Sequence, residues 1–533
     1  MTTRILQGKA WRLAAPLLTL WVVAAVESRR RPFTYDEAAH AHMAWLLDHG
    51  QTPYRDFAAN HLPFFWMGLR PAVRLLPEST TAWYAVLRHL ALAGQVAFLA
   101  LLAAHAARGG GPGAWGRALG AVGLVALAPP ALSFFVEFRP DSLANPLLLG
   151  GLWLLRGRPR RAAACGGGFL TAAALLVNTK YLLLPAILAA LAAWRAGWRA
   201  VRVPAPGPAS KDGNGFVSTA VWAAGGAALA LAAAWGLLRA YGIDPSEAWQ
   251  LAVRYNTATE KLRTFGFGLW RAVLRHPFLL GYMLLGAGGV VWQQVHRRST
   301  LGLWPVGVAI FLAAQVLLMT KPWLQYKASW FLLAATFPAL FVAREPPPRA
   351  RRWEILCWSL VAILAVVSVT GGGGRREPLF RLPDGQAIST DLATQVRVAD
   401  FLLRHAAPEE YVVAEFPWQP LFRSNTFYKI IMDYDGRGRD ALEWAAQALP
   451  DLPHADRMTE PAYLAELQQR PPAVIFLGVF LEQGPVWSPY TEQRTRAIEA
   501  FLESRRDEYE FVEIPDSPFA VVRRVKTGPG SIP

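Results

Sequence analysis

Two adjacent acids and a histidine stand close together near the start of the chain, in the segment Thr-Tyr-Asp-Glu-Ala-Ala-His at residues 34–40. Thr34 can cap a helix that begins here, and Asp36 and Glu37 fit its first turn, where acids complement the helix dipole. His40 follows Asp36 by four residues and would lie on the same helical face. A carboxylate at such a place can also take a proton from a substrate as a general base. The residue types alone favour neither interpretation.

A zinc-protease site is disfavoured at the same segment. That motif needs two histidines four residues apart, and Asp36 occupies the first of these positions. His42, His49 and His61 lie in the same region and could supply metal ligands, although loop histidines are more often solvated. The two cysteines, Cys165 and Cys357, join no cluster of metal ligands and form no disulfide framework, so we expect small core residues.

The segment that carries these acids lies between apolar runs long enough to cross a membrane. The chain has 533 residues, of which 53% are hydrophobic, gathered into runs that match the bilayer core of about 30 Å. A large soluble helical protein is disfavoured by this pattern. We predict about eleven spans, near residues 12–26, 83–105, 118–136, 142–156, 162–178, 180–194, 216–240, 277–295, 301–319, 326–343 and 353–370. The first is expected to be an uncleaved anchor, because no small-residue cleavage site follows it.

The positions of Lys and Arg predict the orientation. With the N-terminus in the cytoplasm, the predicted inner loops hold most of the basic residues close to the spans. These are Arg108 and Arg117, Arg156 to Arg161, Arg195 to Lys211, Arg297 and Arg298, and Arg344 to Arg352. The C-terminal segment is then outside the cell or in the periplasm. The net charge of +16 is the sum of about +22 before residue 371 and about −6 after residue 370. The positive excess favours anionic lipids as partners, and the lack of any recognition motif disfavours nucleic acid.

Acidic side chains before residue 371 gather on the predicted outer side. Six fall in the loop 27–82, namely Glu27, Asp36, Glu37, Asp48, Asp56 and Glu78, and Glu137 and Asp141 end the third span there. None falls in the middle of a predicted span, where an ion-coupled transporter usually needs ionisable groups. This placement favours an enzyme that meets a polar substrate at the interface. A transporter or flippase for a lipid-linked saccharide, without chemistry, stays as the alternative.

The chain after residue 370 has a different character. Short apolar runs at 411–416, 473–477 and 519–522 predict strands, and the stretches 390–406 and 491–505 predict helices. We therefore expect two domains, a membrane domain at 1–370 with the large outer loop 27–82 and an extracytoplasmic α/β domain at 371–533. The second carries no catalytic motif, which favours a docking or lid role.

The outer loop resembles the first outer loop of the GT-C fold glycosyltransferases, which include protein O-mannosyltransferases and lipid A aminoarabinose transferases. The matching residues are Asp36 to His40, Ala44, Gly50, Pro53 to Phe57 and His61 to Pro63. Leu62 stands where the family usually has proline. Further matches are Arg139-Pro140-Asp141, Asn178-Thr179-Lys180, and Gln325-Tyr326-Lys327 with Pro338. The resemblance covers most of the membrane part and little of the C-terminal segment.

The resemblance implies an inverting transfer of a sugar from a polyprenyl-phosphate donor to an acceptor at the outer face of the plasma (inner) membrane. It assigns Asp36 as the general base and Glu37 as a second catalytic residue. The residues expected to bind the donor phosphate or substrate are His61, Arg139, Asp141, Lys180, Tyr326 and Lys327. Asp36, Glu37 and Asp141 are candidates to hold Mg²⁺ or Mn²⁺, since such ions prefer oxygen ligands and only some members use one. The acceptor is a lipid, a glycan or a protein.

Overall fold

The structure of the protein, a computed structural model, divides into two compact units. It describes residues 16–108, 110–156, 160–202, 211–255, 268–297, 302–318, 324–346, 349–370, 377–381, 387–415, 417–426, 449–481, 484–490 and 492–525. The bundle unit is Met1–Arg29, Arg88–Gly236 and Thr264–Gly372, and the loop–tail unit is Arg30–Leu87, Leu237–Arg263 and Gly373–Pro533. The loop that carries Asp36 thus belongs to the same compact unit as the C-terminal segment.

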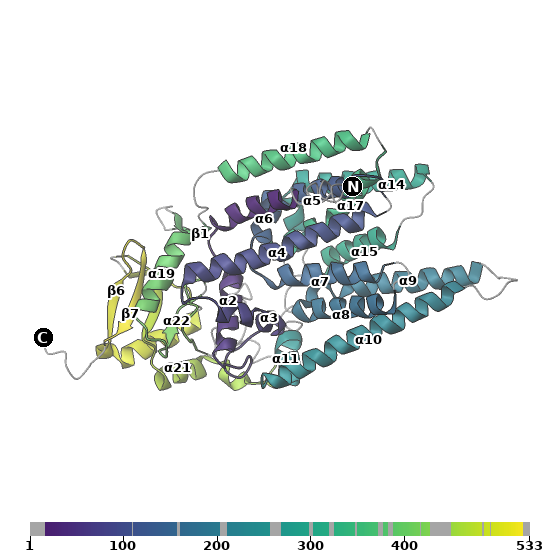
Figure 1. Cartoon of the computed structure of the whole chain (residues 1–533). Coiled ribbons are helices and arrows are strands. Elements are labelled where there is room, and N and C mark those ends of the chain that lie inside the picture. The colour runs from purple at the N-terminus through teal and green to yellow at the C-terminus, as the bar shows by residue number, and fades with distance from the viewer. Residues whose placement is uncertain are drawn as a thin grey trace. The chain divides into compact units, whose positions relative to one another are not determined.

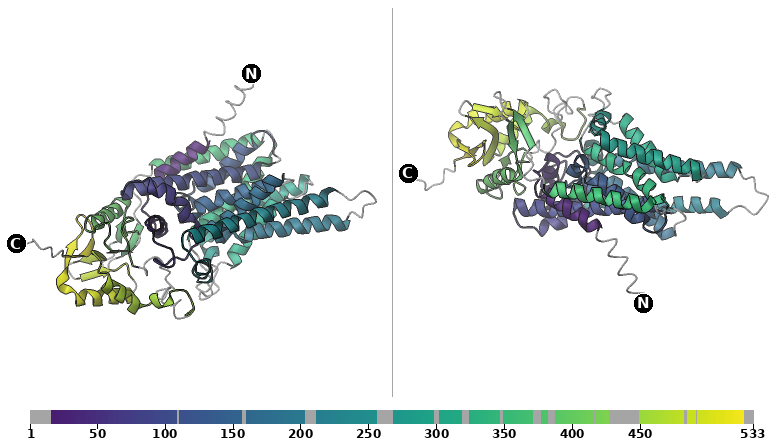
Figure 2. Two further views of the ribbon diagram at one scale, coloured as in Figure 1. Left: turned by 60° about the horizontal axis from the view of Figure 1, so that its bottom comes forward. Right: turned by 90° about the horizontal axis from the view of Figure 1, so that it is seen from above.

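The bundle unit is helical, and its helices run side by side along much of their lengths (Figures 1 and 2). They are Pro16–Ser28, α5 (Ala114–Ala126), α6 (Pro129–Phe135), α7 (Pro140–Leu154), α8 (Arg161–Val177), the short η1 (Thr179–Tyr181), α9 (Leu183–Arg202), α13 (Gly268–Leu274), α14 (Pro277–Arg297), α15 (Leu303–Leu318), α16 (Leu324–Ala334), α17 (Thr336–Arg344) and α18 (Arg349–Thr370). Helices α4 (Thr80–Ala107) and α10 (Lys211–Ala240) have residues in both units.

Each predicted span coincides with one helix or with two consecutive helical segments. Among the described residues, Thr80–Ala107, Val217–Ala240 and Pro277–His296 are long and apolar enough to cross a membrane, and several shorter apolar helices accompany them. Large apolar side chains on α10, α14 and α18 remain exposed, among them Val221, Leu285 and Val366. Such faces suit lipid better than water. The number of crossings, about eleven, stays a prediction.

Two predicted spans are interrupted near their middle. The span 118–136 is divided between α5 and α6, with Pro129 at the start of α6. Proline lacks the N–H that would continue the helical ladder, so a new helix begins there. The span 326–343 is likewise divided into α16 and α17 around Ala335, shortly before Pro338.

The start of α7 lies in close contact with α4. A Cβ atom added to Gly94 of α4 would overlap the backbone carbonyl of Ser142, in the first turn of α7. Only glycine lets two backbones approach so closely, and such contacts are common between membrane helices. Leu99 of α4, Leu149 of α7 and Phe331 of α16 are among the fully buried side chains of the core of this unit. Gly94 therefore sets the position of the first turn of α7.

The loop–tail unit combines helices with a mixed sheet. Its helices are α2 (Tyr35–Asp48), α3 (Phe64–Arg74), α11 (Pro245–Trp249), the π-helical turn η2 (Gln250–Arg254), α19 (Leu392–Arg404), η4 (Ala455–Arg457), α21 (Glu460–Gln469), α22 (Glu492–Ser504) and η5 (Arg506–Glu508). The strands are β1 (Glu377–Arg381), β2 (Ala387–Thr390), β3 (Val412–Val413), β4 (Val474–Leu481), β5 (Gly484–Trp487), β6 (Tyr509–Glu513) and β7 (Phe519–Arg524). Side chains of α19 pack on β4 and β7 around Phe401, Phe476 and Val521.

The sheet has the order β3-β4-β7-β6, with β5 paired to β4, and β1 and β2 form a separate antiparallel pair. Among the described strands, β3 pairs with β4 in parallel, and the other pairs are antiparallel. The predicted strands 473–477 and 519–522 match β4 and β7, whereas the run 411–416 supplies only the two residues of β3. Strand β6 was not predicted, because its sequence Tyr-Glu-Phe-Val-Glu lies largely exposed at the edge and lacks an apolar run.

Candidate functional site

The first turn of α2 is fixed by a reciprocal pair of hydrogen bonds. The backbone N–H of Glu37 donates to the Thr34 hydroxyl over 3.4 Å, and the Glu37 carboxylate accepts from the backbone N–H of Thr34 over 3.1 Å. This is a capping box, in which two otherwise unsatisfied donors at a helix start are paired. The prediction that Thr34 caps a helix is confirmed, and Glu37 has a structural role that the sequence reasoning did not assign.

The two acids of the pair differ in their surroundings. The Glu37 side chain is fully buried, with one carboxylate oxygen bonded to the backbone. Asp36, one residue earlier in the same turn, is half-buried. A group that exchanges a proton with a substrate must be reachable from outside the fold. Of the two acids, Asp36 is therefore the more accessible from outside the fold.

His40 continues the buried face of α2 and is held in one tautomer. The indole N–H of Trp66 donates to its Nδ1 over 3.0 Å, so this nitrogen carries no proton while the bond is made. The rings of His61 and Phe65 lie 5.4 Å from the His40 ring. His61 is exposed. Of the predicted site residues, Asp36, Glu37 and His61 thus occur in one unit, around α2 and the start of α3.

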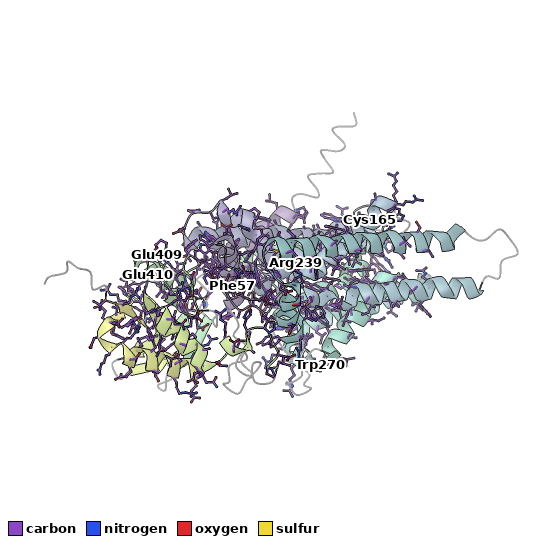
Figure 3. All side chains as sticks on the ribbon, turned by 90° about the horizontal axis from the view of Figure 1, so that it is seen from below. Phe57, Cys165, Arg239, Trp270, Glu409 and Glu410 are labelled. Carbon is purple, nitrogen blue, oxygen red and sulfur yellow. The ribbon has the colours of Figure 1, made fainter. Side chains whose placement is uncertain are left out.

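The family element Tyr54-Arg55-Asp56 shapes the loop between α2 and α3. Tyr54 has a left-handed backbone (φ 72°), is fully buried and donates its hydroxyl proton to the carbonyl of His61 over 2.7 Å. Asp56 accepts from the backbone N–H of Thr52 over 2.7 Å. Phe57, labelled in Figure 3, is buried beside them. These contacts hold His61 in place and give the element a structural role.

The C-terminal segment makes direct contacts with the acidic helix region. The Gln395 side chain of α19 accepts from the backbone N–H of Phe33 over 2.6 Å and donates to its carbonyl over 3.1 Å. A ring nitrogen of His42 bonds to the carbonyl of Arg423 over 2.8 Å. Gln51 donates to Ser424 over 2.7 Å. The C-terminal segment therefore positions α2. No local sequence signal indicated this role.

A second group of predicted residues gathers in the bundle unit at the start of α7. Asp141 forms an ion pair with Lys180 and accepts from the Tyr181 hydroxyl over 3.1 Å. The guanidinium of Arg139 lies 3.3 Å from Glu137 and 3.9 Å from Asp141. All four charged side chains are at most 11% exposed. The structure thus brings Arg139, Asp141 and Lys180 together, and adds Glu137 and Tyr181.

The last predicted pair, Tyr326 and Lys327, lies at the start of α16. The ammonium of Lys327 is 3.0 Å from Nε2 of His276, which precedes α14. An ammonium can only donate, so Nε2 of His276 accepts this bond. Burial, followed by the charges of Lys327 and Arg275, lowers the pKa of His276. The side chain of Tyr326 lies outside the described residues. His276 was missed by the sequence reasoning, because it stands 51 residues from its partner.

The expected metal ligands do not form an oxygen-rich set in the part of the chain that the structure describes. No three side chains of His, Cys, Asp or Glu gather there as a cation would require. Glu37 is engaged by the helix cap, and Asp141 already faces two cations. The binding of Mg²⁺ or Mn²⁺ stays a prediction, and no chemical step is assigned to such an ion. Cys165, labelled in Figure 3, and Cys357 are free thiols.

Comparison with known proteins identifies the fold. No family model matches the sequence, and no curated protein matches it. The structure is similar to that of ArnT from Cupriavidus metallidurans bound to undecaprenyl phosphate, with a TM-score of 0.54, 13% identity and coverage of 98% of this chain and 99% of that chain. The apo state of the same protein gives a TM-score of 0.51, with 13% identity and 98% of each chain covered. The chain therefore shares the fold of ArnT, in agreement with the resemblance that its outer loop indicated.

Proposed function

We propose that this protein is a membrane glycosyltransferase that moves a sugar from a polyprenyl-phosphate donor to an acceptor at the outer face of the membrane. The observation that carries the proposal is the fold, shared over nearly the full length with a transferase structure that contains undecaprenyl phosphate. The acidic helix start and the buried charged cluster supply the residue types that this chemistry needs. The acceptor is a lipid, a glycan or a protein.

Asp36 is proposed as the general base. In an inverting transfer the acceptor oxygen forms a bond to the anomeric carbon while the bond from that carbon to the phosphate oxygen breaks. The acceptor proton goes to the Asp36 carboxylate, and polyprenyl phosphate leaves with the electron pair. The half-buried position of Asp36 supports this role, since the residue is partly exposed and the capping box fixes the backbone of its helical turn.

Arg139 and Lys180 are proposed to contact the donor phosphate, with His61, Tyr326 and Lys327 as further substrate contacts. The first two cations are buried and fixed by Asp141 and Glu137, so they lose little freedom when they meet a phosphate. Asp141 acts as the residue that orients them. Arg139→Gln should then raise the apparent KM for the donor, whereas a guanidinium that only anchors α7 would leave KM unchanged.

The decisive assay incubates purified protein in detergent with a labelled polyprenyl-phosphate sugar and its membrane lipids. The enzyme releases free polyprenyl phosphate, and Asp36→Asn is expected to cut single-turnover transfer by about 10²–10⁴-fold at an unchanged melting temperature. Asn keeps the size of Asp and can still pair with the helix start. Near-normal turnover by a folded Asp36→Asn variant would remove Asp36 from the mechanism.

A flippase for a lipid-linked saccharide is the second candidate, supported by the many-helix architecture. It would move labelled donor across proteoliposomes without releasing polyprenyl phosphate. Transport by a preparation that yields no free polyprenyl phosphate with any envelope lipid, glycan or protein acceptor would favour this candidate over transfer.

We further propose that the protein lies in the plasma (inner) membrane with a cytoplasmic N-terminus and an extracytoplasmic C-terminal segment. The fold and the apolar helices support a membrane location. Cysteine labelling in intact cells tests the orientation. A cysteine placed after residue 525 should react without permeabilisation, and one at residue 351 only after it. The reverse pattern would put the acidic loop in the cytoplasm.

A further inference from the structure

A pocket of about 520 Å³ opens in the bundle unit at the end of α7, away from Asp141. It is lined by Ala104, Ala107, Arg108, Trp115, Trp153 and Arg156. Asp141 lies in the first turn of α7 and Trp153 in its last turn. A rise of 1.5 Å per residue separates these two positions by about 18 Å. The pocket is therefore distinct from the charged cluster around Asp141.

Arg156 is held in place by a buried histidine. One terminal nitrogen of its guanidinium donates both to Nδ1 of His105 over 3.2 Å and to the His105 carbonyl over 3.0 Å. Nε2 of His105 bonds to the carbonyl of Leu149 over 3.1 Å. A carbonyl only accepts and a guanidinium only donates, so His105 is neutral, with its proton on Nε2. Stacking on Trp304, with ring centroids 4.7 Å apart, fixes the histidine ring.

This arrangement leaves the other donors of Arg156 available to a ligand. Within the described part of the chain, both bonds of Arg156 use the same nitrogen, and its remaining N–H groups meet no acceptor there. Neither Arg108 nor Arg156 forms an ion pair with a described carboxylate, and no acid lines the pocket. Arg344 adds a third positive charge near Arg156. The guanidinium groups of Arg108 and Arg156, which pair with no described carboxylate, suit an anion with several oxygens, such as a phosphate.

The residues that line the pocket indicate that a bound phosphate would belong to a membrane lipid. The Arg108 guanidinium lies over the ring of Trp153, 5.9 Å from its centroid, and Trp115 is anchored by a bond to the carbonyl of Ala100 over 3.3 Å. Tryptophans beside arginines at the end of membrane helices are typical of the headgroup level of a bilayer. Ala104 and Ala107 add apolar surface next to the charges.

We propose that this pocket binds the phosphate group of an anionic membrane phospholipid, with Arg156 and Arg108 as phosphate contacts and His105 as the residue that positions Arg156. The pocket lies on the face that the distribution of Lys and Arg predicts to be cytoplasmic. The site is separate from the proposed transfer chemistry and does not depend on it.

The test uses the full-length protein purified in detergent, with native mass spectrometry and thermal melting as readouts. The probes are phosphatidylglycerol, phosphatidylcholine and inorganic phosphate. Phosphatidylglycerol should bind and raise the melting temperature more than phosphatidylcholine does. Loss of a charge-assisted contact should weaken binding by about 10- to 100-fold in Arg156→Gln and in Arg108→Gln. Arg351→Gln, which removes a charge from an exposed position on α18, is the matched control and should bind as the unmodified protein does.

The outcomes separate the alternatives. Equal binding of phosphatidylglycerol by Arg108→Gln, Arg156→Gln and the control would overturn the site. Equal stabilisation by phosphatidylcholine would overturn the preference for an anionic lipid, and saturation by inorganic phosphate alone would overturn a lipid as the source. Arg108 is exposed, so its substitution tests the proposal even where Arg156→Gln fails to fold. His105→Ala should weaken binding less than Arg156→Gln does, because it frees the guanidinium without removing it.

Discussion

Asp36 and Asp141 are acids of the same type in contrasting surroundings. Asp36 is half-buried in the first turn of α2, where a capping box built from neutral groups and Glu37 fixes the backbone. Asp141 is buried among Lys180, Arg139 and Tyr181, and the fold around it depends on its negative charge. A carboxylate that must take and release a proton is better served by the first environment. A carboxylate that must hold cations in place is better served by the second.

The difference also explains why the same substitution should act in opposite ways. Asp→Asn removes charge and basicity but keeps shape. At position 36 this change is expected to remove activity and spare stability, whereas at position 141 it is expected to remove stability first. The same type of substitution at the two positions therefore separates an effect on activity from an effect on stability.

The largest effect is expected from neutralising Asp141. Asp141→Asn leaves buried cations without their partner and should destabilise the protein by about 3–5 kcal/mol, against about 1 kcal/mol or less for Asp36→Asn. The double variant Asp141→Asn with Lys180→Met should recover part of the loss, because the buried cation goes as well. Thermal unfolding in detergent compares the stability of the unmodified protein, the two Asp→Asn variants and the double variant. Equal stability of the two Asp→Asn variants would remove the distinction between the regions.

A smaller effect is expected where the tail meets the acidic helix. Gln395→Ala leaves the backbone N–H and carbonyl of Phe33 without their side-chain partner, at a cost of about 1–3 kcal/mol. Transfer should fall because the start of α2 loses its support, while binding of the donor should change little. Gln469→Ala, at an exposed position of α21, is the control. If both variants retain full turnover, the C-terminal segment does not position α2 for the reaction.

Substitutions of Glu37 should separate its structural role in the capping box from a catalytic role. Their effects on stability should be similar to that of Gln395→Ala or smaller. Glu37→Gln preserves the capping box, because glutamine also accepts from the backbone at this position, so stability should be nearly unchanged. Glu37→Ala should cost about 1 kcal/mol. Turnover of Glu37→Gln should fall less than that of Asp36→Asn. A Glu37→Gln variant as inactive as Asp36→Asn would move the base to Glu37.

The smallest expected effect is a pH dependence at the other end of α2. Burial alone would raise the pKa of Asp48, but hydrogen bonds from Arg70 and Arg74 outweigh it and hold the pKa below its usual value. The ion pair therefore stabilises the protein above the unfolded pKa of about 3.9 and is lost as the pH falls through the lower folded pKa. Melting curves should show the native protein more stable than Asp48→Asn at pH 6, by less than about 1 kcal/mol, with the gap closing below pH 4. A gap that widens in acid would contradict the assignment.

Local features of the site could be predicted from the sequence, and distant ones could not. Thr34, Asp36 and Glu37 define a helix start within four residues, so capping chemistry alone placed them correctly. The contact of Gln395 with Phe33 joins residues 362 positions apart, and that of Tyr181 with Asp141 joins residues 40 apart. Neither leaves a periodic signal. The apolar runs likewise predicted helices but not their breaks at Pro129 and Ala335, because the hydrophobicity of a run does not record where the helical hydrogen bonding is interrupted.

Gly94 has a consequence for how the protein tolerates change. Its backbone touches the carbonyl of Ser142, so even one added methyl group must displace the turn that carries Asp141. A saturation mutagenesis screen scored on activity would then mark position 94 as intolerant, although glycine has no side chain to bind, orient or transfer anything. Libraries that aim to alter substrate preference should hold Gly94 constant and vary the exposed loop positions near His61 instead.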